Sequence, residues 1–583
     1  MNRKKHPYKP SSPNVTLSRF RFQAGLGTAV VAGLFIGIVC FLLVRNYSLS
    51  RIADPLEPAE LTKLKKQLQL QPDNNILKNR IRTFDKNLRQ RFMFHRKFSH
   101  TGGHLLLLGL ILFFIGARTA STFAKEKLTL HPPAAVETQR KDNHLAFWLV
   151  VGLGLVIAGS AVALIAGRPI KINFADISAP DPSLDEFEKY WPRFRGPYGL
   201  GISATHDVPV TWDTATGKNI IWKTEIPLPG HNSPVVWQDQ VFLTGADKKS
   251  CNIFCFHAGT GELLWQRELK PPIPSDNPES LDVMEDTGSA ASSAATDGKR
   301  IFAIFANGYV AGFDFQGKQL WFKNLGIPLS NYGYASSLAL YRNLLLIKYD
   351  QEFNDQDKPQ SKMLALDTRS GNIVWQMPRP VPGSWTSPIV VETKKGPQLI
   401  TCGIPWVIAY NPATGEEIWR AECLNGDIAP SPVYARGIVY VISPSSEVFA
   451  IRTDGRGDVT KTHILWIAED GIPDICSPVT NGKLLFLLTT DGLLTCYSVP
   501  DGKKLWEEEL DEDFQSSPTW VADKLYLLSD KGTMIIVNAD SRFHKIGTAE
   551  LREKSTCSPA FVEGRIYIRG KKHLFCIGKK PDH

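Results

Sequence analysis

The sequence predicts an all-β fold, an eight-bladed β-propeller with four-stranded blades, preceded by an α-helical membrane module. Three observations lead to this prediction. A glycine turn followed by a tryptophan returns along the C-terminal two-thirds of the 583-residue chain, and a Ser-Pro or Ser-Ser pair follows each copy. The N-terminal third holds three apolar segments. Repeats of about 40 to 50 residues that each contain four short strands are typical of propeller blades.

The turn motif is clearest at Asn411 to Trp419, NPATGEEIW. Its glycine can adopt the positive φ of a tight turn, so the apolar runs on either side are predicted to be antiparallel strands. A final copy, around Asn538 to Ile546, has lost both glycine and tryptophan. The recurring tryptophans are predicted to pack between blades, each with a partner for its indole N–H. They are Trp222, Trp265, Trp321, Trp375, Trp419, Trp466 and Trp506.

The order of strands along the repeats also predicts how the ring closes. Each Ser-Pro or Ser-Ser pair opens strand A of a blade, and the motif tryptophan lies near the end of strand D. The last repeat ends at Cys576 after three strands, whereas the strand from Asn219 to Ile226 precedes any strand A. This N-terminal strand is therefore predicted to complete the eighth blade.

These motifs resemble those of a known family. The pattern A-x-D-x-x-T-G-x-x-x-W is similar to the tryptophan-docking motif of PQQ-like (quinoprotein-type) eight-bladed propellers, which include the BamB-like scaffolds of bacterial outer-membrane assembly. The segment from Trp191 to Ser203, WPRFRGPYGLGIS, looks like the opening sequence of PQQ-like repeat proteins. The resemblance covers roughly residues 190 to 577. It implies the propeller fold and an exported domain.

Charge divides the chain into two unlike parts. Residues 1–171 contain 26 Lys and Arg but only eight Asp and Glu, a net charge of +18, which leaves −9 for the remainder of a chain whose total is +9. Because the basic part contains the three apolar segments, it is predicted to be a membrane module and not a nucleic-acid-binding domain. Residues 24–44 and 146–166 each reach the roughly 20 residues that cross a bilayer.

Two of these segments have alternative interpretations. The middle one, residues 102–117, is shorter and could be a re-entrant or interfacial helix. The first could be a signal peptide, but its apolar run is too long and no small-x-small site follows closely, so an uncleaved anchor is predicted. Counting Lys and Arg in the flanking loops does not decide the orientation. The resemblance favours an inner-membrane protein with a cytoplasmic N-terminus and a periplasmic propeller.

The predicted organisation follows from these segments. Between the first two spans, apolar residues at helical spacing indicate a basic helical hairpin, which either binds a membrane surface or partner or consists of two helices packed on each other. The divisions are a cytoplasmic basic tail (1–23), a transmembrane helix (24–44), the hairpin (45–101), a second transmembrane helix (102–117), a loop (118–145), a third transmembrane helix (146–166), a linker (167–189) and the propeller (190–583).

One face of the propeller is predicted to carry the binding site. The D to A and B to C connections lie on the same face, so the long connections Arg267 to Ala291 and Asp350 to Gln360 should converge there. The residues before each strand A should form a polar and aromatic rim that suits an extended peptide. The alternative for any single member is an ordinary strand-start residue. The predicted rim is His231, Asn232, Tyr334, Trp385, Thr386, Gln515 and Ser516, together with Cys476 and Cys557.

The resemblance also raises an enzymatic alternative. A quinoprotein dehydrogenase would need a calcium ion with oxygen ligands, a carboxylate base and an aromatic floor beneath PQQ. Alcohol-oxidising members of the family add a disulfide between adjacent cysteines, but this chain has no adjacent cysteines and no CxxCH haem motif. Glu285, Asp286 and Asp350 could be recruited from face loops, although such acids are expected to be solvated. No catalytic residue, metal site or cofactor is therefore predicted.

The leading functional prediction is a membrane-anchored, non-catalytic scaffold with three spans that binds a protein or peptide partner on its loop-elaborated face. The first alternative is a PQQ- and calcium-dependent quinoprotein dehydrogenase. The second is a membrane sensor whose propeller binds a ligand.

Overall fold

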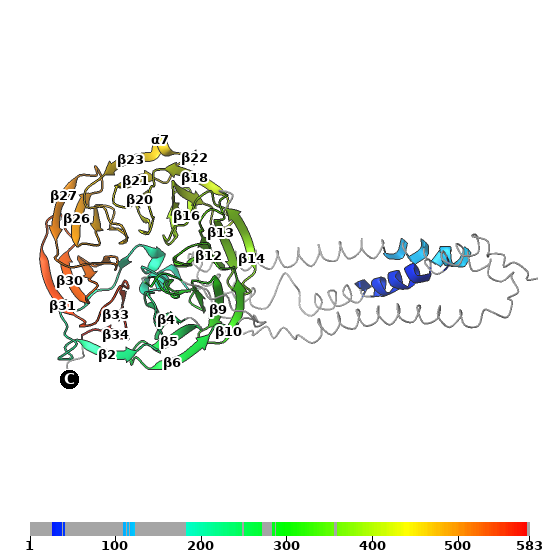
Figure 1. Cartoon of the computed structure of the whole chain (residues 1–583), viewed down its shortest axis with the longest axis horizontal. Coiled ribbons are helices and arrows are strands. Elements are labelled where there is room, and N and C mark those ends of the chain that lie inside the picture. The colour runs from blue at the N-terminus through cyan, green and yellow to red at the C-terminus, as the bar shows by residue number, and fades with distance from the viewer. Residues whose placement is uncertain are drawn as a thin grey trace, which may run out of the picture. The chain divides into compact units, whose positions relative to one another are not determined.

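The structure, a computed structural model, describes most of the C-terminal part of the chain and short helical pieces near the N-terminus (Figure 1). The described residues are 22, 26–37, 39–40, 109–111, 113–115, 117–122, 182–247, 250–270, 283–285, 287–354 and 358–579. The chain forms two compact units, Met1–Ile177 and Ser178–His583.

Eight separate sheets form a closed ring in the second unit (Figure 1), which confirms the predicted eight-bladed propeller with four-stranded blades. Each blade is an antiparallel meander of strands A to D, with strand D on the outer rim. In the first four blades these strands are β3 (Val235–Trp237), β4 (Gln240–Ala246), β5 (Cys251–His257) and β6 (Leu263–Glu268); β7 (Ala295–Thr296), β8 (Arg300–Ile304), β9 (Tyr309–Asp314) and β10 (Gln319–Asn324); β11 (Ala339–Tyr341), β12 (Leu344–Tyr349), β13 (Lys362–Asp367) and β14 (Ile373–Pro378); and β15 (Ile389–Thr393), β16 (Gly396–Gly403), β17 (Trp406–Tyr410) and β18 (Glu417–Glu422).

The fifth to eighth blades repeat this arrangement. Their strands are β19 (Val433–Ala435), β20 (Ile438–Ser443), β21 (Glu447–Arg452) and β23 (Ile464–Ala468); β24 (Val479–Thr480), β25 (Leu484–Leu488), β26 (Leu493–Ser498) and β27 (Lys504–Glu509); β28 (Thr519–Val521), β29 (Lys524–Leu528), β30 (Thr533–Asn538) and β31 (Lys545–Glu550); and β32 (Ala560–Val562), β33 (Arg565–Arg569), β34 (His573–Ile577) and β2 (Ile220–Glu225). The predicted closure is confirmed, because β2 pairs antiparallel with β34.

Two short strands extend the ring beyond this plan. Strand β1 (Ile202–Ser203) pairs in parallel with β28, and β22 (Gly457–Asp458) pairs in parallel with β18. The second comes from the long C to D hairpin of the fifth blade, which also carries α7 (Thr460–His463). Helix α6 (Leu184–Lys189), capped by Ser183, lies within the predicted linker, and its Phe187 ring packs 6.0 Å from the ring of Trp237.

The motif tryptophans join neighbouring blades. Six of the seven indoles donate their N–H to a carbonyl in the C to D turn of the next blade, at 2.9–3.2 Å. Trp419 differs because the next hairpin is the longer one. Its indole donates to Oε1 of Gln398 in its own blade, at 2.9 Å, and the Gln398 amide donates to the carbonyl of Thr453 in the fifth blade, at 2.8 Å.

The position facing each tryptophan on strand C holds a small residue, which leaves room for the indole. These residues are Cys255, Gly312, Ala365, Ala409, Ala450, Cys496 and Cys576. In the seventh blade Gly547 takes the place of the tryptophan, and the facing residue is the larger Ile536. Trp212, from the segment before β2, is buried in the same apolar cluster as Ile536, so this segment supplies an indole where the repeat has lost its own.

A ring of serines lines the inner ends of the blades. A backbone N–H in each Ser-Pro or Ser-Ser pair donates to a serine hydroxyl in the pair of the next blade, at 2.8–3.1 Å. Seven such hydrogen bonds follow one another around the ring. The last of these links runs from the Ser517 N–H to the Ser558 hydroxyl. The Ser-Pro and Ser-Ser pairs therefore connect the strands A of neighbouring blades by hydrogen bonds around the centre.

The opening segment from Trp191 to Ser203 crosses the middle of the ring (Figure 1). Arg193 and Arg195 are buried there and donate to the carbonyls of Pro388 and Pro478, at 2.6 and 2.5 Å, in the connections before the fourth and sixth blades. Burial lowers the pKa of Arg193 to about 10 and that of Arg195 to about 9. This segment therefore links blades that are far apart in the chain.

The described pieces of the N-terminal unit are helical and pack against each other. A Cβ at Gly109 would lie 2.9 Å from Cγ1 of Ile36, and one at Gly33 would lie 3.6 Å from Cε2 of Phe113. Among the described residues, no helix is both long enough and apolar enough to count as a membrane span. The predicted hairpin (45–101), most of the loop (118–145) and the third predicted span (146–166) lie outside the described residues.

Candidate functional site

The loop face, defined as the face that carries the D to A and B to C connections, brings the two long connections together. The connection between β10 and β11 lies between them. Its Asn331 carbonyl accepts from the Met284 N–H, at 3.1 Å, and its Leu329 carbonyl accepts from the Glu352 N–H, at 2.8 Å. The described parts of the two insertions thus converge on one side of the face, at the second and third blades.

Apolar side chains stand exposed on these joined connections. Met284, Ile327, Leu329 and Phe353 are 36–50% exposed, and together they form the loop-face patch. Two exposed carboxylates, Glu285 and Glu352, are adjacent in sequence to members of this patch. Exposed apolar groups with a polar border are typical of surfaces that bind other proteins.

Beneath the patch lies a network of fully buried charges. Asp350, at the start of the B to C connection of the third blade, accepts hydrogen bonds from Nε of Arg379 at 2.7 Å and from Nη2 at 3.2 Å. Its second oxygen also lies 3.0 Å from Nζ of Lys348 and 2.9 Å from Oγ of Ser384. The side chains of the three charged residues are inaccessible to solvent. The expectation that Asp350 is solvated is therefore wrong.

The positive charges of Arg379 and Lys348 keep the carboxyl group of Asp350 ionised. Burial alone raises the pKa of a carboxyl group, but Arg379 and then Lys348 outweigh burial and lower the pKa of Asp350 below its ordinary value. Burial lowers the pKa of Lys348 to about 8, although Asp350 opposes that effect. Arg379 also donates to Oγ1 of Thr401, at 2.5 Å, and so ties the third blade to the fourth. The network therefore fixes the base of the patch-bearing connection.

The predicted rim residues of the third and fourth blades lie beside the patch. Tyr334 is buried and stacks on Tyr349, with ring centroids 5.5 Å apart. Trp385 packs edge-on against Tyr332, at 4.7 Å, and Tyr332 belongs to the same connection as Leu329. Thr386 is buried, and its hydroxyl donates to the Cys402 carbonyl at 3.3 Å.

The other predicted rim residues lie on the first and seventh blades. Asn232 is buried, and its amide donates to the carbonyls of Thr244 and Ala290, at 2.7 and 2.9 Å. Nδ1 of His231 lies 3.0 Å from Oγ1 of Thr556. Gln515 donates through its side chain to Asp530 at 3.1 Å, and Ser516 is buried. Asn232 and Ser516 thus lie inside the protein, and a binding role for the rim residues stays a prediction.

Comparison with known proteins identifies the family. The family model described as outer membrane protein assembly factor BamB matches residues 202–331, 360–475 and 458–571, together more than half of the chain. The chain belongs to the BamB family. The predicted PQQ-like and BamB-like resemblance is confirmed. No curated protein matches the sequence significantly.

Solved structures similar to this BamB-family chain have low sequence identity to it. BamB from Moraxella catarrhalis is 15% identical, with 61% of this chain and 99% of that chain covered and a TM-score of 0.47. Quinohemoprotein alcohol dehydrogenase from Comamonas testosteroni is 13% identical, with coverages of 73% and 85% and a TM-score of 0.52. Quinohemoprotein alcohol dehydrogenase ADHIIG from Pseudomonas putida HK5 is 11% identical, with coverages of 68% and 81% and a TM-score of 0.51. The likeness to the two dehydrogenases concerns the fold alone.

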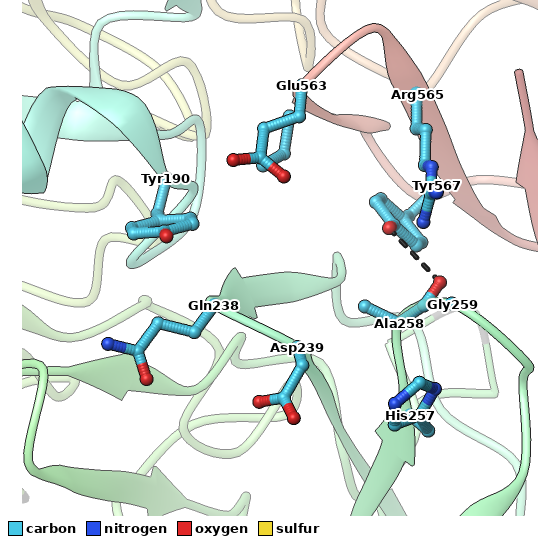
Figure 2. A pocket seen from close by; sticks show the side chains of 10 residues that line it. Tyr190, Gln238, Asp239, His257, Ala258, Gly259, Glu563, Arg565 and Tyr567 are labelled. Carbon is cyan, nitrogen blue, oxygen red and sulfur yellow. Dashed lines mark hydrogen bonds between the residues drawn. The ribbon is translucent and has the colours of Figure 1, made fainter.

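The opposite face of this BamB-family propeller carries a pocket that sequence reasoning missed. We call it the turn face, because it carries the A to B and C to D turns. The pocket lies between the eighth and first blades and has a volume of about 340 Å³ (Figure 2). In the sequence its turns look like ordinary polar links between strands, WQDQ and VEGR, so no signal set them apart. The lining residues are Tyr190, Gln238, Asp239, His257, Ala258, Gly259, Val562, Glu563, Arg565 and Tyr567.

Within the part of the chain that the structure describes, no three His, Cys, Asp or Glu side chains gather as the ligands of a metal ion. Of the face-loop acids that the sequence singled out, Asp350 has its carboxylate engaged by four contacts inside the protein. A carboxylate in that state does not fit the role of a substrate base beside a quinone.

Proposed function

We propose that the protein is a scaffold whose loop face binds a protein or peptide partner. The observation that carries this proposal is the loop-face patch, in which four apolar side chains stand exposed on two insertions and the connection between them. Protein interfaces typically have such an apolar centre with a polar rim. Membership of a family named for an assembly factor supports the same conclusion.

The charges around the patch indicate the kind of partner. Glu285 and Glu352 border it, and the chain beyond residue 171 has a net charge of −9. A segment with two or three aliphatic or aromatic anchors and flanking Lys or Arg would match both features. The buried Asp350 network supports this role, because it fixes the backbone from which Glu352 and Phe353 project.

The enzymatic alternative has less support. A quinoprotein dehydrogenase requires a carboxylate that reaches the substrate, and Asp350 is buried with Arg379 and Lys348 as partners. Neither PQQ nor calcium is therefore part of the proposed function. No feature of the described residues favours the sensor alternative over the scaffold.

A single substitution in the patch should abolish partner binding without unfolding the protein. We expect Leu329→Asp to weaken binding by roughly 30-fold or more, because a central apolar contact at an interface contributes about 2 kcal/mol and a buried carboxylate would lose its hydration. The stability of the propeller should change by less than about 0.5 kcal/mol, since Leu329 is on the surface.

Site-specific photo-cross-linking in cells provides the measurement. A photoreactive residue at position 353 should give a defined cross-linked product that disappears when Leu329→Asp is introduced. The matched control is position 505, where Leu505 is similarly exposed on the outer strand β27, and it should give no such product. A product from position 353 that survives Leu329→Asp would contradict the proposal.

We further propose that the N-terminal module anchors the propeller at the inner membrane, with the propeller in the periplasm. The three apolar segments of the sequence support this, and so does the exposure of Val31, Phe114 and Ile115 on the described helical pieces. Apolar side chains facing outward from a helix are stable when lipid covers them.

The full-length chain should therefore remain in the membrane fraction after an alkaline carbonate wash. An alkaline phosphatase fused at the C-terminus should be active, because that enzyme folds only after export, whereas the same fusion placed within residues 1–23 should be inactive. Release of the chain by carbonate would refute the anchor. An inactive C-terminal fusion would refute the orientation.

A further inference from the structure

We propose that the pocket on the turn face, between the eighth and first blades, binds a neutral sugar unit. This site is separate from the loop face, since A to B and C to D turns lie at the opposite ends of the strands from the D to A and B to C connections. The inference does not depend on the proposed partner binding. It rests on the walls of the pocket, its balance of charge and the side chain at the start of strand B in the eighth blade.

Two tyrosines line the pocket, and one of them, Tyr190, is partly exposed. Tyr190, which follows α6, packs 5.0 Å from Trp237, and Tyr567 on β33 donates from its hydroxyl to the Ala258 carbonyl, at 3.2 Å. Figure 2 shows Tyr190 on one side and Tyr567 with Arg565 on the other, and Asp239 between them. The apolar C–H face of a pyranose packs on an accessible aromatic ring, and Tyr190 offers one, whereas Tyr567 is only 2% exposed. A volume of about 340 Å³ is at the small end of ligand pockets and accommodates one or two sugar rings.

The polar groups of the pocket are mixed and balanced in charge. Asp239 and Glu563 supply carboxylate acceptors, while Arg565 supplies guanidinium donors and Lys189 lies 2.8 Å from Glu563. His257 accepts from the Thr260 N–H through Nδ1, at 3.1 Å, so the neutral ring carries its proton on Nε2. A ligand with hydroxyl groups, which donate and accept equally, matches this set better than an ion does, because no sign of charge predominates.

The side chain that lines the pocket from strand B of the eighth blade, Arg565, occupies a position that varies from blade to blade. Arg565 occupies the strand B position that Gln240 and Gln398 occupy in the first and fourth blades. Those glutamines donate to the turn of the next blade, at 3.3 and 2.8 Å, and so close the gap between blades. In the eighth blade Tyr567, farther along the strand, makes the contact with the next turn, and Arg565 lines the pocket beside it.

Saturation-transfer NMR on the full-length chain provides the first test. The probes are glucose, N-acetylglucosamine, cellobiose and chitobiose, with glucuronate and glucosamine as charged competitors. We expect at least one neutral probe to give a signal and the charged probes not to displace it at equal concentration. Monosaccharide binding would indicate a free sugar, and binding of a disaccharide alone would indicate a glycan chain; both outcomes support a sugar site. No signal from any neutral probe would overturn the proposal, and so would tighter binding of either charged probe.

Two pairs of variants test the location of the site. Arg565→Gln introduces the residue that the first blade has at this position, and Asp239→Asn removes a carboxylate; each should weaken binding at least tenfold. The controls are Lys524→Gln and Asp523→Asn, because Lys524 and Asp523 hold the same turn positions in the seventh blade. Undiminished binding by both Arg565→Gln and Asp239→Asn would overturn the proposed site. Because the loop-face cross-link should survive all four substitutions, failure here is distinguishable from failure of the proposed function.

Discussion

Replacing Asp350 with alanine should destabilise the propeller by about 3–5 kcal/mol, the cost of leaving buried charges without their partner. Asp350 is the only carboxylate among the described contacts of Arg379 and Lys348, and all three side chains are inaccessible to solvent. Without Asp350, the guanidinium of Arg379 would be buried with no counter-ion. Lys348 would have to lose its proton or move its ammonium group into solvent. Urea unfolding followed by tryptophan fluorescence measures the loss.

The exposed Glu352, two residues away, provides the matched control. Glu352→Ala should change the free energy of unfolding by less than about 0.5 kcal/mol. The triple variant Lys348→Met, Asp350→Leu, Arg379→Met should recover most of the stability, since apolar residues of similar volume often replace a buried ion network without loss. An Asp350→Ala variant as stable as Glu352→Ala would show that the network contributes nothing to the fold.

Replacing Gly371 with alanine should cost about 2–5 kcal/mol, from two physical sources. Gly371 has a φ of +66°, and an L-residue in that conformation costs roughly 1–2 kcal/mol. Its Cβ would also lie 2.6 Å from Cε3 of Trp321, the docked indole of the preceding blade. Overpacking of this kind costs about 1–3 kcal/mol more. The turn glycine is thus required by its neighbour as well as by its own backbone.

Gly217 separates these two contributions, because it is the glycine of the first turn motif and has a φ of +73° with nothing within 4 Å of an added Cβ. Gly217→Ala should therefore cost only the backbone strain, about 1–2 kcal/mol. The difference between the two variants in unfolding midpoint reports the contact with the indole. Equal losses would mean that the glycines are required by the turn alone.

The repeat pattern predicted the architecture because it depends on residues that are close together in the sequence. A turn glycine and a tryptophan at fixed spacing predict a hairpin, and both lie within the nine residues from Asn411 to Trp419. Ring closure was predicted in the same way. The strand Ile220–Glu225 is a strand D that precedes any strand A, and the last repeat has only strands A to C, so the two were expected to pair. The convergence of the two long connections was likewise predictable from the direction of the strands.

The sites were harder to predict because their members come from separate segments of the chain. Asp350 looks like one of many loop acids, and its burial depends on Arg379 and Lys348, which approach it from two other positions in the blade. Asn232 was predicted to face a ligand, but in the fold its amide meets backbone carbonyls. Trp212 lies outside the repeat pattern, yet it is buried in the same apolar cluster as Ile536, which faces the position where the seventh blade lacks its tryptophan.

The sequence by itself therefore determined the blade, the number of blades, the closing strand and the face on which the insertions meet. Each of these depends on spacing along the chain, which can be read directly from a repeated sequence. Only the tertiary structure decided which charges are buried, which rim side chains make hydrogen bonds within the protein, and where a pocket opens between Tyr190 and Tyr567. These features depend on distances between side chains tens to hundreds of residues apart, and such distances are set by packing between blades and not by any local pattern.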